Sequence, residues 1–257
     1  MSHLTEALTD FSAESKNDTK VAARTHTRQA TLSTFWKNTL FNYPTLTLPE
    51  KDASLAPKPK KFNHIPFSLD ASLSQSMYEF SRQYNSNLFC FFYLGLIETL
   101  SKLTQQSDIA ITTLLHGQTN EVSPLLLRYK LNQKLSFCEQ FTQASLSVLQ
   151  AYEHKDSNLE SLLTQLNLKS PELFQIMMSV TDGHSRNMIY LPCKECTTIP
   201  FPNHHPKAEI SFSLQHTEEG IQGELCYNES RYEAKFIETL LASFKENLQE
   251  NLQYFNK

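Results

Sequence analysis

The chain has 257 residues, of which 40% are hydrophobic, 19% are charged and five are glycine, a composition typical of a folded globular protein. The glycines are too scattered for G-x-G-x-x-G or a P-loop, so nucleotide binding through either motif is excluded. A net charge of −4 without a basic stripe argues against a nucleic-acid partner.

The sequence also argues against membrane insertion and export. It contains no run of about 18 apolar residues, and its first residues, Met-Ser-His-Leu-Thr-Glu, lack the basic and apolar parts of a signal peptide. The five cysteines are odd in number and lie in apolar contexts, which favours reduced thiols. We therefore expect a soluble cytoplasmic protein that contacts no membrane.

The amino-terminal part differs in character from the rest. Residues 1–31 are polar, so we expect a flexible leader, although Leu4, Leu8 and Phe11 have the spacing of a short amphipathic helix. The folded region is expected at residues 32–257. It begins with a brief helix at 34–40 and continues through a proline-rich extended crossing at 44–66.

From residue 65 onward, helical and strand patterns alternate. We predict strands at 65–69, 108–115, 125–131, 173–180, 188–191, 210–214 and 221–227, the last two forming a hairpin. We predict helices at 71–84, 87–104, 136–154, 159–168 and 229–254, with Asp70 and Ser136 as N-caps. On the helix 136–154 we expect one apolar face, formed by Phe137, Phe141, Leu146, Leu149 and Tyr152. The fold class is α/β, with a mixed sheet covered by helices.

Few residues have the spacing of a catalytic or metal site. Cys193 and Cys196 form a C-x-x-C pair followed by His204 and His205, but no second C-x-x-C completes a zinc site, so we expect no metal. No G-x-S-x-G elbow is present. His116 follows a predicted strand and precedes Gly117, a position where functional residues occur, so it is kept as a catalytic candidate.

Several segments in order along the chain resemble the carboxy-terminal lobe of condensation domains of nonribosomal peptide synthetases. They are Phe35-Trp36, Leu100 to Ile111 with its Thr-Gln-Gln-Ser-Asp-Ile, Leu125-Leu-Leu-Arg128, Ala151-Tyr-Glu-His-Lys-Asp156, Pro171-Glu-Leu-Phe-Gln-Ile176 and Gly223-Glu-Leu-Cys-Tyr-Asn228. The resemblance implies a fold like that of chloramphenicol acetyltransferase. The resemblance also implies that residues 32–257 are one lobe of a two-lobed domain.

The resemblance also implies a chemistry. In this family two lobes form a V, and pantetheine arms borne by carrier proteins enter a tunnel between them. The amine of an acceptor attacks the donor thioester, and the second histidine of H-H-x-x-x-D-G orients or deprotonates that amine. No cofactor is expected on this chain itself, because phosphopantetheine would arrive on a carrier protein.

Two departures from the family pattern concern the site. The motif H-H-x-x-x-D-G belongs to the family's other lobe, and the only near match here, His204-His-Pro-Lys-Ala-Glu-Ile210, has Glu209 for Asp and Ile210 for Gly. His205 is the corresponding catalytic candidate, and a structural loop is the alternative. Before Leu125, Ser123 stands where the family has Asn.

Three positions match the family's substrate tunnel, namely Ser123, Arg128 and Ser179. The alternative for each is structural: Arg128 as a salt-bridge former, and the serines as hydrogen-bonded strand residues. Three functions remain open. The chain is one lobe of a condensation domain that needs a partner lobe, a non-catalytic scaffold that docks a carrier protein or synthetase, or a self-assembling acyltransferase that uses His116 or His205.

Overall fold

The computed structural model describes residues 31–43, 45–51, 59–116, 122–155, 164, 175–182, 208–217 and 219–253. The chain divides into two compact units, one of residues 1–43 and 153–168 and the other of residues 44–152 and 169–257. Among the described residues, no helix is long and apolar enough to cross a membrane.

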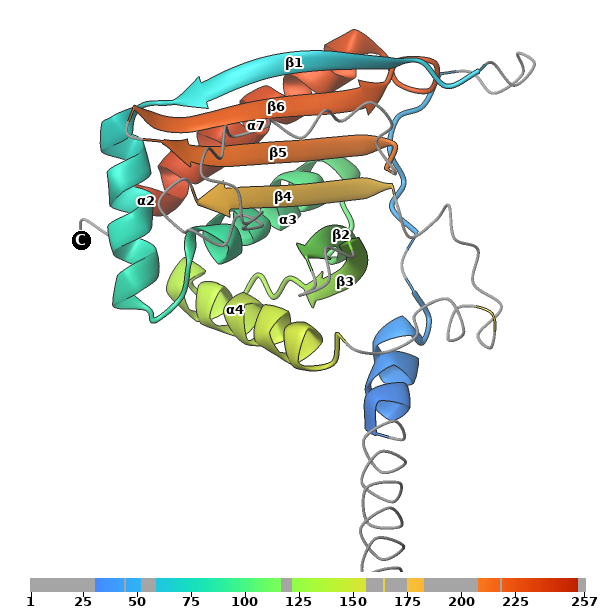
Figure 1. The fold of residues 1–257 in the computed structure, drawn as a ribbon, viewed down its shortest axis with the longest axis vertical. Coiled ribbons are helices and arrows are strands. Elements are labelled where there is room, and N and C mark those ends of the chain that lie inside the picture. Colours follow the sequence, from blue (N-terminus) through green and yellow to red (C-terminus); the bar gives the residue numbers. More distant parts are fainter. Residues whose placement is uncertain are drawn as a thin grey trace, which may run out of the picture. The chain divides into compact units, whose positions relative to one another are not determined.

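The larger unit is built on a six-stranded sheet with the strand order β1-β6-β5-β4-β2-β3 (Figure 1). Its strands are β1 (Phe62–Leu69), β2 (Asp108–His116), β3 (Val122–Lys130), β4 (Ile176–Asp182), β5 (Ile210–Thr217) and β6 (Gly220–Asn228). β4 pairs in parallel with β2 and β5, and the other three pairs are antiparallel. The predicted mixed sheet is therefore confirmed.

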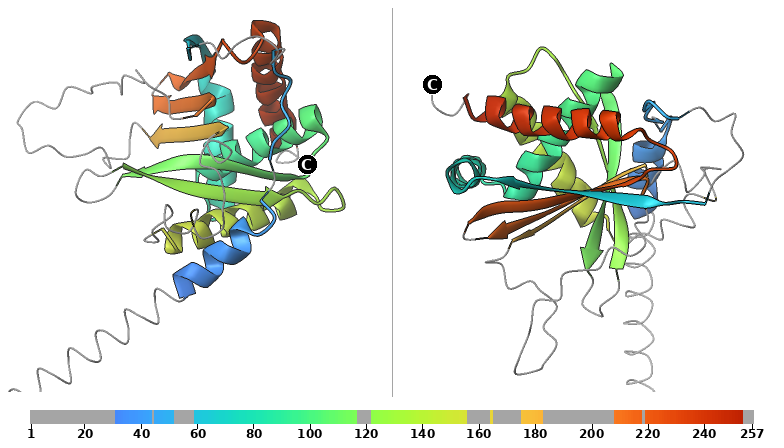
Figure 2. Two further views of the ribbon diagram at one scale, coloured as in Figure 1. Left: turned by 90° about the vertical axis from the view of Figure 1, so that its right-hand side faces the viewer. Right: turned by 90° about the horizontal axis from the view of Figure 1, so that it is seen from above.

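In the described part of the larger unit, four helices accompany this sheet: α2 (Ala71–Gln83), α3 (Leu88–Thr104), α4 (Phe137–Glu153) and α7 (Ala234–Gln253). α3 and α7 lie on one side of it, as the right-hand view of Figure 2 shows. Phe212 of β5 meets Phe244 of α7 with ring centroids 5.1 Å apart. Tyr129 of β3 donates its hydroxyl proton to the Gln140 carbonyl of α4 at 3.2 Å.

The helix starts follow local side-chain chemistry. Asp70 accepts a hydrogen bond from the Leu73 N–H at 2.8 Å, so it caps α2 as predicted. Ser136 and Glu139 form a capping box: the Ser136 N–H and hydroxyl both donate to the Glu139 carboxylate, at 2.8 and 2.7 Å. These hydrogen bonds hold the pKa of the Glu139 carboxyl below its usual value. The predicted cap at Ser136 is confirmed.

The predicted hairpin is present as β5 and β6, and Gly220 is required at its turn. Gly220 has φ +116°, and a Cβ there would lie 2.5 Å from the Leu69 carbonyl oxygen. Only glycine adopts this conformation in this space without strain.

Some predicted boundaries are displaced. β1 begins at Phe62 and β3 at Val122, each three residues before the prediction. α7 begins at Ala234 rather than at 229, because Arg231 and Tyr232 donate their N–H groups to the Asn228 carbonyl in a turn. The predicted strand 188–191 lies outside the described residues, as does the helix 159–168 apart from residue 164.

The predicted single apolar face of α4 is wrong. Phe137 and Phe141 are buried, whereas Leu146, Leu149 and Tyr152 are 53%, 51% and 47% exposed. At 3.6 residues per turn, Leu146 lies about 140° and Leu149 about 80° around the helix from Phe141, and Tyr152 lies in its last turn. The apolar residues of α4 thus form two faces, and only one packs into the core.

In the smaller unit, the helix predicted at 34–40 extends over residues 31–40. Trp36 donates its indole N–H to the His154 carbonyl at 2.8 Å, and the Phe35 ring stacks on the His154 ring at 4.0 Å. This contact occupies His154, the histidine of the segment 151–156.

Candidate functional site

The two faces of the sheet carry different side chains, because successive residues of a strand point to opposite sides. One set, including Phe212 and its register partner Leu225, faces α3 and α7. The other set, which we call the polar face, contains the apolar residues Ala110, Leu126 and Met177. Its polar and ionisable residues and its cysteine are His64, Asp108, Thr112, Arg128, Ser179, Ser211, Ser213, Gln215, Glu224 and Cys226.

Arg128 is held on this face by an ion pair across β2 and β3. Its Nε and Nη2 donate to the two carboxylate oxygens of Asp108 at 2.9 and 2.7 Å. The side chains are 18% and 30% exposed. A bidentate pair of this kind orients the guanidinium and ties the start of β2 to the end of β3. This contact agrees with the structural alternative for Arg128, namely a residue that forms a salt bridge.

Ser179 lies on the polar face with Arg128, whereas Ser123 does not. The Ser179 hydroxyl donates to Ser213 of the next strand at 3.4 Å, and both residues are half-buried. Ser123 pairs with Leu115, is exposed, and belongs to the alternate set of β3 residues. The structure therefore places two of the three predicted tunnel positions on one face of the sheet, on strands separated by β2.

Of the two histidine candidates, the structure describes only His116. His116 is the last residue of β2 and pairs with Val122 at the start of β3. His205 lies outside the described residues, as do Cys193 and Cys196. Elsewhere, no group of three or more His, Cys, Asp or Glu side chains in the described part of the chain is placed to hold a metal ion.

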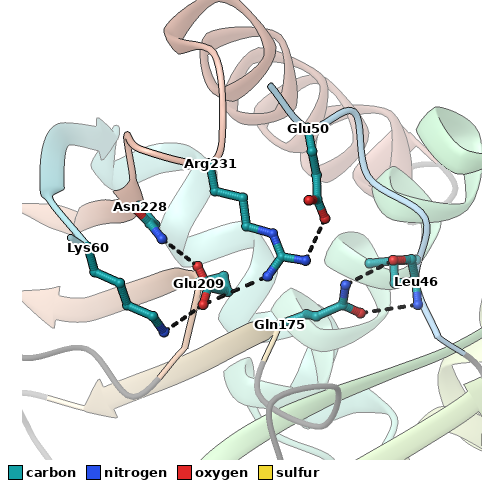
Figure 3. A network of polar contacts seen from close by, with 7 residues as sticks. All are labelled: Leu46, Glu50, Lys60, Gln175, Glu209, Asn228 and Arg231. Carbon is teal, nitrogen blue, oxygen red and sulfur yellow. Dashed lines mark hydrogen bonds and ion pairs between the residues drawn. The ribbon is translucent and has the colours of Figure 1, made fainter. Parts of the chain in front are cut away.

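Glu209, the acidic residue of the near match to H-H-x-x-x-D-G, is the centre of a polar network at the amino-terminal end of β5 (Figure 3). Its side chain is 9% exposed. Lys60 and Asn228 donate to its two oxygens at 2.7 Å each, and Arg231 lies 3.8 Å away. Arg231 in turn reaches Glu50 at 2.5 Å. We call these five residues the clasp.

The clasp keeps Glu209 ionised. Burial alone would raise its pKa, but the hydrogen bonds from Lys60 and Asn228 and the charges of Lys60 and Arg231 outweigh this, so the pKa lies below its usual value. Because the clasp joins Glu50 and Lys60 of the extended crossing to the sheet, its role is structural. The sequence pattern does not predict the clasp, because it assigns residues 44–66 only to an extended crossing.

Two glutamines hold the same crossing by its backbone. Gln175 accepts from the Leu46 N–H at 3.1 Å and donates to the Leu46 carbonyl at 3.0 Å (Figure 3). Gln106 accepts from the Thr47 N–H at 2.8 Å and donates to the Thr45 carbonyl at 3.0 Å. Each side-chain amide satisfies backbone groups as a neighbouring strand would.

A thiol, an imidazole and a carboxylate meet on the polar face at the β1–β6 edge. Cys226 and His64 are register partners, with Sγ and Nε2 3.7 Å apart, and His64 Nδ1 lies 2.9 Å from a Glu224 oxygen. Burial, then the Glu224 charge, raises the pKa of the Cys226 thiol to about 11. The thiol is thus protonated at neutral pH, which argues against its acting as a nucleophile.

The known proteins that are similar in sequence to this chain include peptide synthetases. The chain is 26% identical over 234 residues to an isonitrile lipopeptide synthase of Mycobacterium tuberculosis, covering 83% of this chain and 9% of that protein. It is 22% identical over 208 residues to surfactin synthase subunit 1 of Bacillus subtilis, covering 76% and 6%. The chain thus spans a small part of the curated relatives it matches.

Solved structures show the same fold. The X-domain from teicoplanin biosynthesis aligns with a TM-score of 0.73 at 19% identity, covering 87% of this chain and 54% of that one. The condensation domain of the monacolin K polyketide synthase aligns with a TM-score of 0.68 at 18% identity, covering 91% and 59%. The predicted fold, similar to that of chloramphenicol acetyltransferase, is confirmed.

The family model for the condensation domain matches residues 18–256, nearly the whole chain. With the mixed sheet, the helices beside it and the synthetase relatives, this match identifies the chain as a member of the condensation-domain family.

Proposed function

We propose that this chain acts as one lobe of an amide-forming condensation domain in nonribosomal peptide biosynthesis, completed by a second lobe that carries H-H-x-x-x-D-G. One observation carries the proposal: the family model spans residues 18–256, yet the chain covers only 54% and 59% of the two solved chains. The described residues form a single six-stranded sheet, and the sequence holds no intact H-H-x-x-x-D-G.

In this proposal the complementary lobe covers the polar face. That face presents Arg128, Ser179 and Ser213 away from α3 and α7, and these side chains offer hydrogen bonds to a pantetheine arm or its acyl group. Covering the face excludes water, which would otherwise hydrolyse a thioester. The bidentate contact to Asp108 keeps Arg128 in one orientation.

The reaction proposed is transfer of a carrier-bound acyl group to an amine. The acceptor nitrogen attacks the donor carbonyl, the carbon–sulfur bond breaks, and the pantetheine leaves as a thiol. The histidine of the complementary lobe takes the nitrogen's proton and returns it to the sulfur. This chain contributes the surface that positions the arms.

The edges of the sheet support docking through the face rather than through strand pairing. Both outer strands of the described sheet contain a proline, Pro66 in β1 and Pro124 in β3. Proline has no N–H to donate and interrupts pairing with a partner's strand.

The test is reconstitution. The protein is mixed with a purified amino-terminal condensation lobe carrying H-H-x-x-x-D-G and with donor and acceptor carrier proteins, and amide product is measured by mass spectrometry. We expect complex formation and product that requires both lobes. Complex without product would favour the scaffold, and failure to bind any such lobe would overturn the proposal.

Two substitutions make the test specific. Gln215→Arg changes an exposed residue of the polar face, and Glu246→Arg changes an exposed residue of α7, on the other side of the sheet. We expect loss of binding only for Gln215→Arg. Product that persists without the second lobe and disappears in His116→Ala would instead support the acyltransferase.

A further inference from the structure

The cluster of Cys226, His64 and Glu224 has an arrangement that the proposed function does not use. His64 Nδ1 is 2.9 Å from the Glu224 carboxylate, so this nitrogen carries the proton of the neutral ring. Nε2 is then the unprotonated nitrogen, and it faces the Cys226 sulfur. Histidines that bind metal ions almost always donate their other ring N–H in this way, commonly to a carboxylate.

The separation of the two donor atoms suits a shared metal ion. Zinc lies about 2.3 Å from a cysteine sulfur and about 2.1 Å from a histidine nitrogen, and a tetrahedral angle between them places the two atoms about 3.6 Å apart. Cys226 Sγ and His64 Nε2 are 3.7 Å apart in the structure. A metal ion therefore fits between them without movement of either strand.

A third donor lies beside the thiol. Ser211 is the register partner of Cys226 on β5, as His64 is on β1, so all three side chains are on one face. Ser211 is 5% exposed, and its buried hydroxyl has no partner among the described residues other than the neighbouring thiol. Buried hydroxyls are normally satisfied, so this oxygen is available as a ligand.

The exposure of the cluster favours a metal ion over a reacting substrate as its ligand. Cys226 is 1% exposed, so its sulfur cannot meet the carbon of a bulky substrate. The His64 and Glu224 side chains are 42% and 44% exposed. A small ion therefore reaches the Cys226 sulfur when the His64 ring turns aside.

We propose that Cys226 and His64 bind a thiophilic divalent cation of the zinc type, with Glu224 orienting His64 and Ser211 supplying an oxygen. The Cys226 thiol releases its proton to water as the sulfur–metal bond forms. Thiolate and imidazole together prefer such ions to magnesium or calcium. Water completes the coordination shell.

The experiment uses the full chain carrying Cys138→Ser, Cys193→Ser and Cys196→Ser, so that the thiols of Cys138 and of the C-x-x-C pair make no contribution. Cd²⁺ is titrated in and the thiolate-to-cadmium absorption is recorded, and Zn²⁺ is titrated by calorimetry. We expect one equivalent of each metal to bind, with Mg²⁺ giving no signal.

Single variants then assign the ligands. Cys226→Ser should remove the cadmium band, and His64→Ala and Glu224→Gln should each weaken binding by about 10- to 100-fold. Cys90→Ser, which removes a buried thiol elsewhere, should leave binding unchanged. Circular dichroism verifies folding, and His64→Ala alters an exposed side chain, so the test survives if Cys226→Ser does not fold. Absence of a band, a band retained in Cys226→Ser, or equal affinity in His64→Ala overturns the proposal.

Discussion

The two faces of the sheet show how the same strands serve packing on one side and recognition on the other. On the helix-covered face, Phe212 packs against Phe244, and Gly95 of α3 leaves room for Leu248 of α7. On the polar face, contacts are discrete hydrogen bonds and ion pairs such as those of Arg128 and Ser179. Stability should therefore depend on the first face and binding on the second.

The strongest test of this contrast is Phe244→Ala. Phe244 is fully buried and contacts Phe92 and Phe212. Truncating it should lower the free energy of unfolding by about 3–5 kcal/mol, measured by urea denaturation. A loss below about 1 kcal/mol would show that the helices do not depend on this contact.

The clasp should give the next largest effect. Glu209→Ala leaves Lys60 and the buried Asn228 amide without their acceptor, and we expect a loss of about 2 kcal/mol at neutral pH. Because the pKa of Glu209 is lowered, its contribution is present above the ordinary glutamate pKa and is lost as the pH falls through the folded-state value. The gap between variant and wild type should therefore narrow in acid.

Lys61→Ala serves as the matched control for the clasp. It removes the exposed lysine of a neighbouring ion pair, that of Lys61 with Glu229. It should lower the free energy of unfolding by less than Glu209→Ala does. Equal losses in the two variants would mean that burial of Glu209 adds nothing.

Glu98→Gln should have a smaller effect of opposite sign. Glu98 of α3 accepts from Asn251 of α7 at 2.7 Å, and burial raises the pKa of its carboxyl. Its contribution is complete below the unfolded-state pKa and is lost as the pH rises through the folded-state value. Gln keeps the acceptor without the charge, so the variant should be more stable than wild type at pH 7, with a flatter pH profile. Lower stability at pH 7 would contradict this account of Glu98.

The smallest effect is expected for Ser213→Ala on the polar face. It removes the acceptor of the 3.4 Å hydrogen bond from Ser179 and should change the unfolding free energy by less than about 0.5 kcal/mol. A larger loss would show that the polar face also stabilises the fold.

The sequence predicted the elements whose causes are local. Asp70 and Ser136 mark helix starts because their side chains bond to N–H groups in the next turn. The wrong prediction of a single apolar face on α4 also has a local cause. Listing the apolar residues of the helix ignores that Leu146 and Phe141 point in different directions around its axis. The family followed from short segments in a shared order.

The rest depends on contacts distant in sequence. Lys60 and Glu209 are 149 residues apart, and His64 and Cys226 are 162 apart. His64 meets Cys226 because β1 pairs with β6, and Lys60 meets Glu209 because β6 also pairs with β5. No local pattern predicts the register of β1 on β6. Likewise Arg128 and Ser179 share a face only through the pairing of β2 with β4.

The central claim, that a complementary lobe covers the polar face, is tested most directly by thiol labelling. Gln215→Cys and Glu246→Cys are made in the variant lacking Cys138, Cys193 and Cys196, and maleimide labelling rates are measured with and without the lobe carrying H-H-x-x-x-D-G. We predict slower labelling at position 215 on addition of the lobe and an unchanged rate at position 246. Unchanged rates at both positions, or protection at 246 alone, would contradict the claim.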